Sequence, residues 1–210
     1  AIVNLAGADG PNDVQLQELT PGGRTARQHH LYEELVFVAE GDGATVVGEG
    51  ENEVTFEWSE GALFFVPRAT PFRHVNLSPD DRALLVASTP LPLQLYLNKD
   101  PALVFDPDYD HWSAVRAADF YSAEGALYSG EYPGDGYHRE KPALWDANFV
   151  PDVFRFDELS TDLTSGVTYS NVHFPMPDSS MYCHVGESPV GTYKMAHRHC
   201  PGAHLMFITG

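Results

Sequence analysis

Short stretches of alternating apolar and polar residues, separated by turns, run through the N-terminal part of the chain. Residues 13–19 and 54–58 alternate in this way, and residues 62–66 form an apolar run that ends at Pro67. A period of two indicates a strand with one buried face. Further strands are expected at residues 34–39, 44–48, 72–76 and 82–87. Short strands joined by Gly, Pro and Asp turns are typical of a sandwich or barrel, so the sequence predicts an all-β domain here.

The composition excludes some kinds of partner. The 210 residues carry a formal net charge of -18, and 43% of them are hydrophobic. Nucleic acids and anionic membrane surfaces repel such a chain, so neither is expected as a partner. No apolar run reaches the roughly 18 residues of a membrane-spanning helix, and the first residues show no signal-peptide pattern. We expect a cytoplasmic protein from which some N-terminal sequence has been removed, because the chain does not begin with Met.

Three histidines lie close together near the C-terminal end. His197 and His199 are two residues apart, so a strand would point both side chains the same way. Pro201-Gly202 predicts a turn, and the apolar residues 205–208 predict a buried strand that would bring His204 back toward the other two. Neutral imidazoles bind iron, copper, nickel and zinc. The pattern therefore predicts a metal site of His197, His199 and His204, and a chance cluster on a surface loop is the alternative.

A spaced pattern in the N-terminal part resembles the first motif of the cupin superfamily. The motif is a Gly, two His separated by one residue, a Glu and a second Gly. Here Gly22, His30, Glu34 and Gly41 occupy the corresponding positions, and Gln28 stands where the first His is expected. The resemblance implies a β-barrel of the jelly-roll type.

A second pattern resembles the second cupin motif. Gly61, Pro67 and Asn76 fall at the motif's distances. Ala69 replaces a Gly, and Phe72 stands at the position of the expected His. The spacing of the motif is therefore kept, but another ligand is missing.

These two departures bear on metal binding by the first barrel. The favoured expectation is a barrel that no longer holds a metal. The alternative is an atypical second site of His30, Glu34 and His74, with Gln28 or His29 nearby, because His74 shares a strand face with the residue at the expected ligand position.

The C-terminal histidines repeat the first motif. Five residues separate Gly191 from His197, as five residues separate Gly22 from Gln28. Such an internal repeat makes the chain similar to the bicupins, which have two tandem cupin barrels. The second barrel is incomplete, because the chain stops where several more strands are needed, and truncation is the expected explanation.

The second copy departs from the motif at the Glu position. If Gly210 aligns with Gly41, Ala203 occupies that position and His204 points to the other face. We prefer His204 as a ligand, because some cupin dioxygenases resemble this arrangement in using three His and no carboxylate.

The patterns divide the chain into three segments. Residues 1–97 are expected to be the N-terminal cupin barrel, and residues 98–165 a connecting strap, mostly irregular and rich in aromatic residues. One short helix is expected in the strap at residues 112–120. Residues 166–210 are expected to start the second barrel, with strands at 167–174 and 181–186.

The resemblance to bicupin dioxygenases implies an oxidoreductase that acts on a small organic molecule through the three-histidine metal site. Fe(II) is the metal expected, since three protein ligands leave open positions for catalysis. Mn, Ni or Zn are the alternatives, and Ni or Zn would suit isomerase or hydrolase chemistry. A non-catalytic ligand-binding or storage-type bicupin is the other interpretation. The resemblance also implies a homo-oligomer, and the sequence assigns no catalytic residue beyond the ligands.

Overall fold

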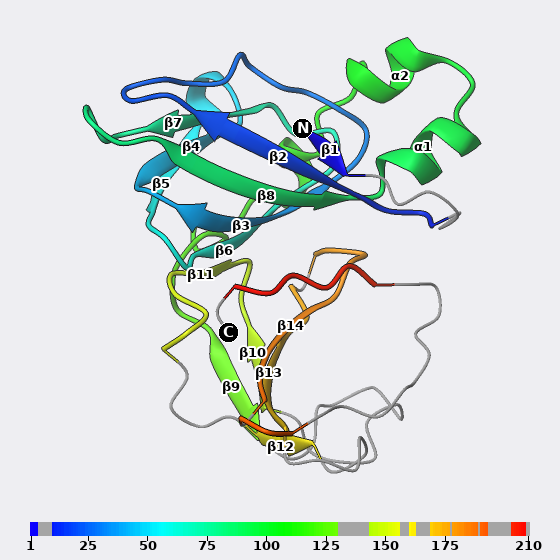
Figure 1. Cartoon of the computed structure of the whole chain (residues 1–210). Helices are drawn as coiled ribbons and strands as arrows, with labels where there is room; N and C mark the ends of the chain where they lie inside the picture. Colours follow the sequence, from blue (N-terminus) through cyan, green and yellow to red (C-terminus); the bar gives the residue numbers. More distant parts are fainter. Residues whose placement is uncertain are drawn as a thin grey trace.

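The computed structural model describes residues 1–3, 10–129, 143–155, 160–162, 169–176, 178–188, 190–192 and 203–208. They form two mainly β parts, one above the other in Figure 1, with short helices beside the N-terminal part. No helix among these residues has the length and apolar character needed to cross a membrane.

The N-terminal part consists of two antiparallel sheets. The larger sheet has the strand order β1-β2-β8-β3-β6-β11, and the smaller has the order β5-β4-β7. The bounds are β1 Ile2–Val3, β2 Asp13–Leu19, β3 Glu34–Glu40, β4 Gly43–Val47, β5 Val54–Trp58, β6 Leu63–Val66, β7 Phe72–Asn76, β8 Ala83–Thr89 and β11 Phe149–Val150, with a 3-10 turn η1 at Gly50–Asn52. The predicted strands are confirmed. The closed barrel that was expected is not confirmed, because no ladder among the described strands joins the two sheets.

Aromatic side chains form much of the hydrophobic core around these sheets. Phe64, Phe65 and Phe72 are almost completely buried, and Phe56 stacks on Tyr121 with ring centroids 4.1 Å apart. Burying one such side chain stabilises the folded state by about 1.5–3 kcal/mol. In strand β8 every second residue is buried. The period-two pattern in the sequence therefore corresponds to one strand face turned toward the core.

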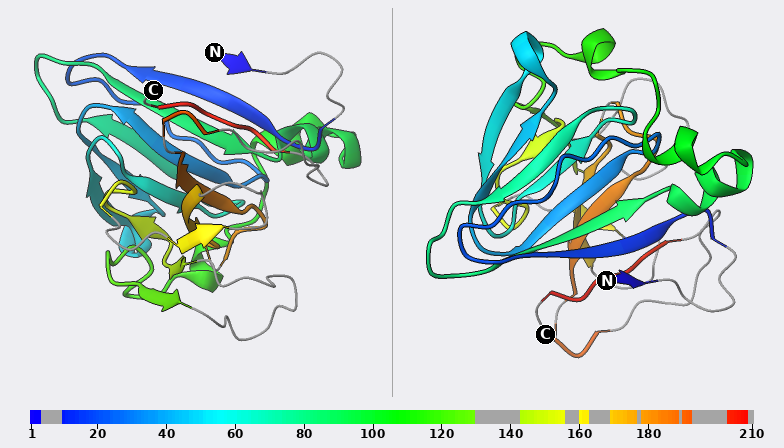
Figure 2. Two further views of the ribbon diagram at one scale, coloured as in Figure 1. Left: turned by 60° about the horizontal axis from the view of Figure 1, so that its bottom comes forward. Right: turned by 90° about the horizontal axis from the view of Figure 1, so that it is seen from above.

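The strap predicted to be mostly irregular contains regular structure. Helices α2 (Pro101–Phe105) and α3 (Trp112–Val115) lie within it, and helix α1 (Leu91–Leu97) precedes it at the end of the expected barrel segment. In α2 the Asp100 side chain accepts a hydrogen bond from the backbone N–H of Ala102 at 2.9 Å, as an N-cap does. The predicted helix at 112–120 is shorter than expected, because Arg116 adopts an extended conformation. Both views of Figure 2 show α1 and α2 (green) at the margin of the N-terminal sheets.

A third sheet, which we call the second sheet because it forms the second part of the structure, lies below the N-terminal part in Figure 1. It has the order β12-β13-β10-β9, and β14 also pairs with β13. The bounds are β9 Ala126–Ser129, β10 Ala143–Asp146, β12 Ser160–Asp162, β13 Tyr169–Phe174 and β14 Cys183–Glu187. The strands expected at 167–174 and 181–186 are thus present as β13 and β14. Residues 167 and 168 lie outside the described residues, and β14 begins two residues and ends one residue later than expected.

The two parts share one hydrophobic core and several hydrogen bonds. Val172 and Phe174 of β13 belong to the same buried cluster as the aromatic residues of the N-terminal sheets. The buried Glu33 carboxylate accepts a hydrogen bond from the backbone N–H of Ser180 at 2.9 Å, and the backbone N–H of Phe65 donates to the Asn148 carbonyl at 3.0 Å. The second sheet is therefore packed directly against the N-terminal part.

The buried strand expected at residues 205–208 is wrong. Residues 203–208 have no regular secondary structure, and Leu205 and Phe207 are 76% and 86% exposed. An apolar run becomes a buried strand only where a neighbouring strand supplies hydrogen bonds, and no ladder among the described residues includes this segment.

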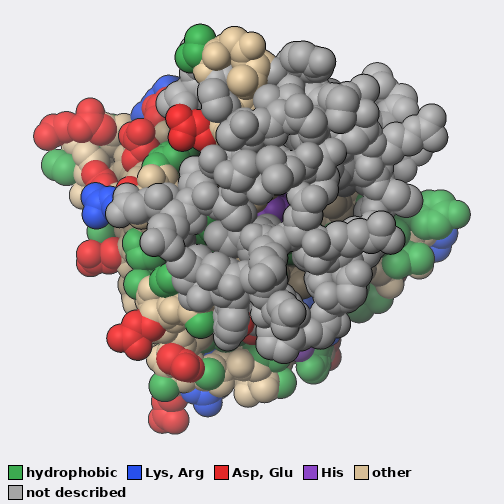
Figure 3. All heavy atoms as spheres, turned by 90° about the horizontal axis from the view of Figure 1, so that it is seen from below, with side chains coloured by type: hydrophobic (Ala, Val, Ile, Leu, Met, Phe, Trp, Pro, Cys, Tyr) green, Lys and Arg blue, Asp and Glu red, His purple; other side chains and the backbone are tan. Residues whose placement is uncertain are grey.

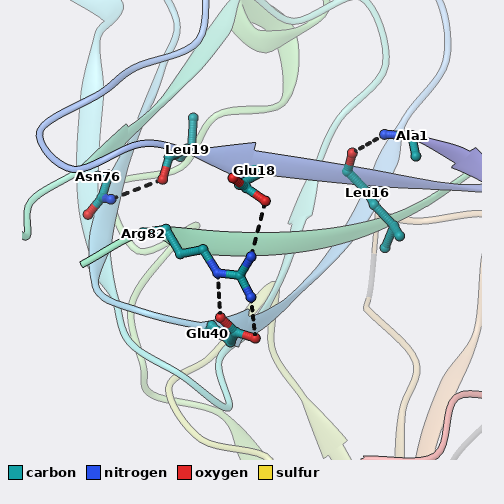
Figure 4. Close-up of polar contacts among 7 residues, drawn as sticks. All are labelled: Ala1, Leu16, Glu18, Leu19, Glu40, Asn76 and Arg82. Carbon is teal, nitrogen blue, oxygen red and sulfur yellow. Dashed lines mark hydrogen bonds and ion pairs between the residues drawn. The ribbon is translucent and has the colours of Figure 1, made fainter.

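Charged side chains dominate parts of the surface. On the face seen in Figure 3, the acidic side chains of the described residues gather toward one side, in keeping with the net charge of -18. On the larger sheet, Arg82 bridges two strands: it donates to Glu18 at 3.2 Å and to both carboxylate oxygens of Glu40 at 3.0 and 3.2 Å (Figure 4). These contacts tie β2 and β3 to the start of β8.

Candidate functional site

Three polar side chains meet in the interior of the N-terminal part. His30 lies in the loop before β3, Glu34 is the first residue of β3 in the larger sheet, and His74 lies in the middle of β7 in the smaller sheet. Their exposed fractions are 4%, 0% and 0%. The structure thus brings together the three residues of the atypical site considered from the sequence, which we call the interior cluster.

Two hydrogen bonds fix the His30 ring. Its Nδ1 lies 2.7 Å from the Tyr32 carbonyl oxygen, and its Nε2 lies 3.2 Å from Glu34 Oε1. A carbonyl oxygen only accepts hydrogen bonds, so Nδ1 carries a hydrogen and donates it. The contact between Nε2 and Oε1 then needs one further proton, on either the imidazole or the carboxyl group. Both forms leave the pair without net charge, which is how a buried acid and base avoid the cost of desolvation.

His74 is held from the smaller sheet. Its Nδ1 lies 2.8 Å from the Thr45 hydroxyl, which also accepts a hydrogen bond from the Trp58 indole N–H at 2.9 Å. Burial lowers the pKa of His74 to about 4; the nearby Glu34 carboxylate opposes this shift, and His30 adds to it. The ring is therefore neutral at neutral pH.

Two polar atoms of the interior cluster, Glu34 Oε2 and His74 Nε2, are buried and have no hydrogen-bond partner among the residues that the structure describes. Buried polar atoms are normally paired, so these two mark the place where a small ligand or water molecule would be bound.

Aromatic rings enclose the same place. The Phe72 ring packs edge-on against His30 at 5.3 Å between centroids and lies 5.2 Å from His74, and the Tyr32 ring stacks on His30 at 3.6 Å. Burial raises the pKa of Tyr32. Phe72 occupies the position at which the cupin motif has a histidine. A phenyl ring therefore contacts both imidazoles at the place where the motif has a metal-binding imidazole.

In the interior cluster one carboxylate oxygen is hydrogen-bonded to His30, and a phenyl ring packs against both imidazoles. Across the part of the chain that the structure describes, no group of three or more His, Cys, Asp or Glu residues is arranged to hold a metal.

A cavity of about 410 Å³ opens beside strands β1 and β2. The side chains that line it carry no formal charge. They belong to Ala1, Ile2, Gln15, Leu16, Gln17, Thr25, Ala26 and Gln28. The Gln15 side chain opposes the rise in the pKa of Tyr32, which burial causes, and the Tyr32 ring stacks on His30. The cavity therefore adjoins the interior cluster through one tyrosine.

The predicted C-terminal metal ligands are only partly described. His197 and His199 lie outside the described residues, and His204 is exposed. Gly191, which opens the second copy of the motif, has a φ of 80°, and Gly22, which opens the first, has a φ of 62°. Both glycines therefore adopt the left-handed conformation.

A second group of histidines was not expected from the sequence. His173 on β13 lies directly opposite His184 on β14, and the two rings stack with centroids 5.1 Å apart. Both strands were predicted, but only the register of their pairing places these side chains together, and no local pattern in the sequence fixes that register.

The comparison with known protein families matches only the N-terminal part of the chain. Residues 15–88 match the family described as Cupin domain. This part of the chain is a cupin domain. The match leaves α2, α3 and the whole second sheet outside it. No curated protein matches the chain.

Several solved structures are similar to part of this chain. Vicilin from Capsicum annuum is 19% identical with a TM-score of 0.37, and the match covers 38% of this chain and 22% of that one. A mutant oxalate decarboxylase from Bacillus subtilis is 17% identical with a TM-score of 0.35, covering 38% and 21%. Peruvianin-I, a cysteine peptidase from Thevetia peruviana latex, is 23% identical with a TM-score of 0.35, covering 38% and 50%. The matched part is thus about a fifth of the vicilin and decarboxylase chains.

Proposed function

We propose that the protein is a metal-dependent, dioxygenase-like bicupin oxidoreductase that acts on a small organic molecule, with its metal on His197, His199 and His204. The observation that carries the proposal is the shared left-handed conformation of Gly22 and Gly191. A Cβ atom at either glycine would meet no atom of the described residues within 4 Å, and a positive φ is the conformation that favours glycine. Both copies of the motif thus begin with a glycine in the left-handed conformation.

The cupin domain has a supporting role in this proposal. Its interior cluster is enclosed by Phe72 and Tyr32, so the chemistry is assigned to the histidines of the second copy. The donor set there is three imidazoles, which suits Fe(II) and also Mn, Ni or Zn. Fe(II), when bound, would supply the electrons that activation of O2 requires.

The test is the metal content of the full-length protein and of two variants. The purified protein is expected to retain about one Fe per chain by elemental analysis and to consume O2 when a catechol or a diketone is added. His197→Asn is expected to lose both properties. His29→Asn is the matched control, because His29 contacts the Tyr109 carbonyl in the cupin domain, away from the second copy of the motif. Full metal content in His197→Asn, or none in the unmodified protein, would contradict the proposal.

The cavity beside β1 and β2 favours a second candidate function, which is the binding of a small polar ligand without catalysis. Three glutamine side chains and one threonine hydroxyl line about 410 Å³ in a chain of net charge -18. Amides and hydroxyls recognise neutral polar molecules such as sugars. Thermal-shift measurements with uncharged sugars and small amides test this function. A shift that Gln15→Ala abolishes, in protein that holds no metal, would favour binding over catalysis.

A further inference from the structure

The pairing of β13 with β14 places two histidines side by side on one face of the second sheet. His173 and His184 are direct cross-strand partners, and their ring planes are inclined by 20° at a centroid distance of 5.1 Å. Side chains alternate between the faces of a strand, so the neighbouring pairs Val172–Val185 and Phe174–Cys183 point to the opposite face.

The opposite face holds this pair of strands rigidly. Val172 and Phe174 are completely buried in the core shared with the cupin domain, and Cys183 and Val185 pack against that core. Burial also raises the pKa of the Cys183 thiol to about 11, so the thiol stays protonated at neutral pH. The backbone positions of both histidines are therefore set by close packing, which lowers the entropic cost of bringing two ligands to one ion.

A tyrosine orients one of the two rings. The Tyr182 hydroxyl forms a short hydrogen bond with Nδ1 of His173, and the two rings lie 5.3 Å apart. When Nδ1–H donates to this hydroxyl oxygen, the lone pair of His173 lies on Nε2. A hydrogen bond from the second ring nitrogen is the usual device that fixes the tautomer of a metal-binding histidine.

The stacked geometry also brings the two rings within reach of one ion. Nitrogen atoms that share one metal at about 2.0–2.1 Å lie roughly 3–4 Å apart, a spacing that small rotations of rings at 5.1 Å can reach.

We propose that His173 and His184 chelate one divalent transition-metal ion of the imidazole-preferring class, Cu(II), Ni(II) or Zn(II). Tyr182 is a positioning residue for His173, and water completes the coordination. This site lies on the second sheet, outside the cupin domain, and it shares no residue with the proposed site of His197, His199 and His204. It does not depend on the proposed function.

The test is a titration of the full-length protein with Ni(II) alone at pH 7.5, read by calorimetry. His173→Asn and His184→Asn are each expected to lose one equivalent of bound Ni(II). Tyr182→Phe is expected to keep the stoichiometry and to weaken that equivalent by roughly 10–100-fold. His29→Asn is the control and is expected to bind as the unmodified protein does.

A double variant, His197→Asn with His199→Asn, separates the two proposed sites. It is expected to retain the equivalent that His184→Asn loses. Binding by His173→Asn and His184→Asn that equals that of the unmodified protein would overturn the site, whatever the double variant does. Electron paramagnetic resonance of bound Cu(II) adds a spectroscopic reading, in which hyperfine coupling to two imidazole nitrogens supports the site and coupling to none overturns it. Unchanged Ni(II) affinity in Tyr182→Phe would overturn the positioning role.

Discussion

The interior cluster of the cupin domain and the histidine pair of the second sheet each bring two imidazoles together, in opposite surroundings. In the interior cluster, His30 and His74 come from the loop before β3 and from β7, and both are buried. In the second sheet, His173 and His184 face each other across one strand pair and are only partly buried.

The difference lies in the neighbours of each pair. Phe72 packs against both imidazoles of the interior cluster, whereas the Tyr182 hydroxyl forms a hydrogen bond with His173. A hydrocarbon ring encloses an imidazole, and a hydrogen-bonding ring directs its lone pair. Motif spacing therefore locates the interior cluster, but the adjacent aromatic residues set the surroundings of each histidine pair.

The largest expected effect tests how tightly the interior cluster is enclosed. Phe72→Ala removes a ring that is only 2% exposed, so the free energy of unfolding should fall by about 3–5 kcal/mol in urea denaturation. The matched control is Phe207→Ala, since Phe207 is 86% exposed and its loss should change stability by less than about 0.5 kcal/mol. Equal effects of the two substitutions would show that Phe72 does not fill the interior.

A second prediction concerns the charge of His74. Its pKa is lowered from 6.5 to about 4, so between these values the unfolded chain binds a proton that the folded chain excludes. Stability should therefore be complete above pH 6.5, fall as the pH decreases toward 4, and level off below it, a loss of about 3 kcal/mol in all.

Urea denaturation across this pH range measures the loss. His74→Gln should flatten the slope between the two pH values, and His204→Gln, at an exposed position, should keep it. A slope that survives in His74→Gln would assign the acid sensitivity to another group.

The smallest expected effect concerns the ion pairs on the outside of the larger sheet. Glu40 and Glu18 raise the pKa of Arg82, which is fully exposed to solvent screening. Arg82→Ala should lower the denaturation midpoint slightly at low salt, and the difference should vanish in 1 M NaCl because exposed pairs are screened. Arg155→Ala, which removes a local pair with Asp152, serves as the control and should show no effect at either salt concentration. A difference that persists in 1 M NaCl would mean that Arg82 acts through packing and not through charge.

Much of the cupin domain could be predicted from the sequence because its strands are short, are either alternating or wholly apolar, and are separated by turns. Helices α1 and α2 could not be predicted, because Pro92 and Pro101 suggest that a helix is interrupted. Both prolines lie in the first turn of their helix, where proline is well tolerated. The capping role of Asp100 was visible only once the helix was known.

The candidate sites divide in the same way. His30, Glu34 and His74 could be found because motif spacing ties them to one barrel interior. The pair of His173 and His184 could not, because a shift of one residue in the register of β13 and β14 would send the two rings to different faces. The prediction for His197 and His199 remains a prediction, since both lie outside the described residues.

The pairing of β11 with β6 has a consequence for synthesis on the ribosome. Strand β6 emerges early and displays Leu63, Phe64 and Phe65, but Phe149 and Val150, which cover its open edge, are made much later. An uncovered strand of this composition invites contact with other nascent chains. The larger sheet of this protein is therefore completed only after translation has passed well beyond the last strand of the cupin domain.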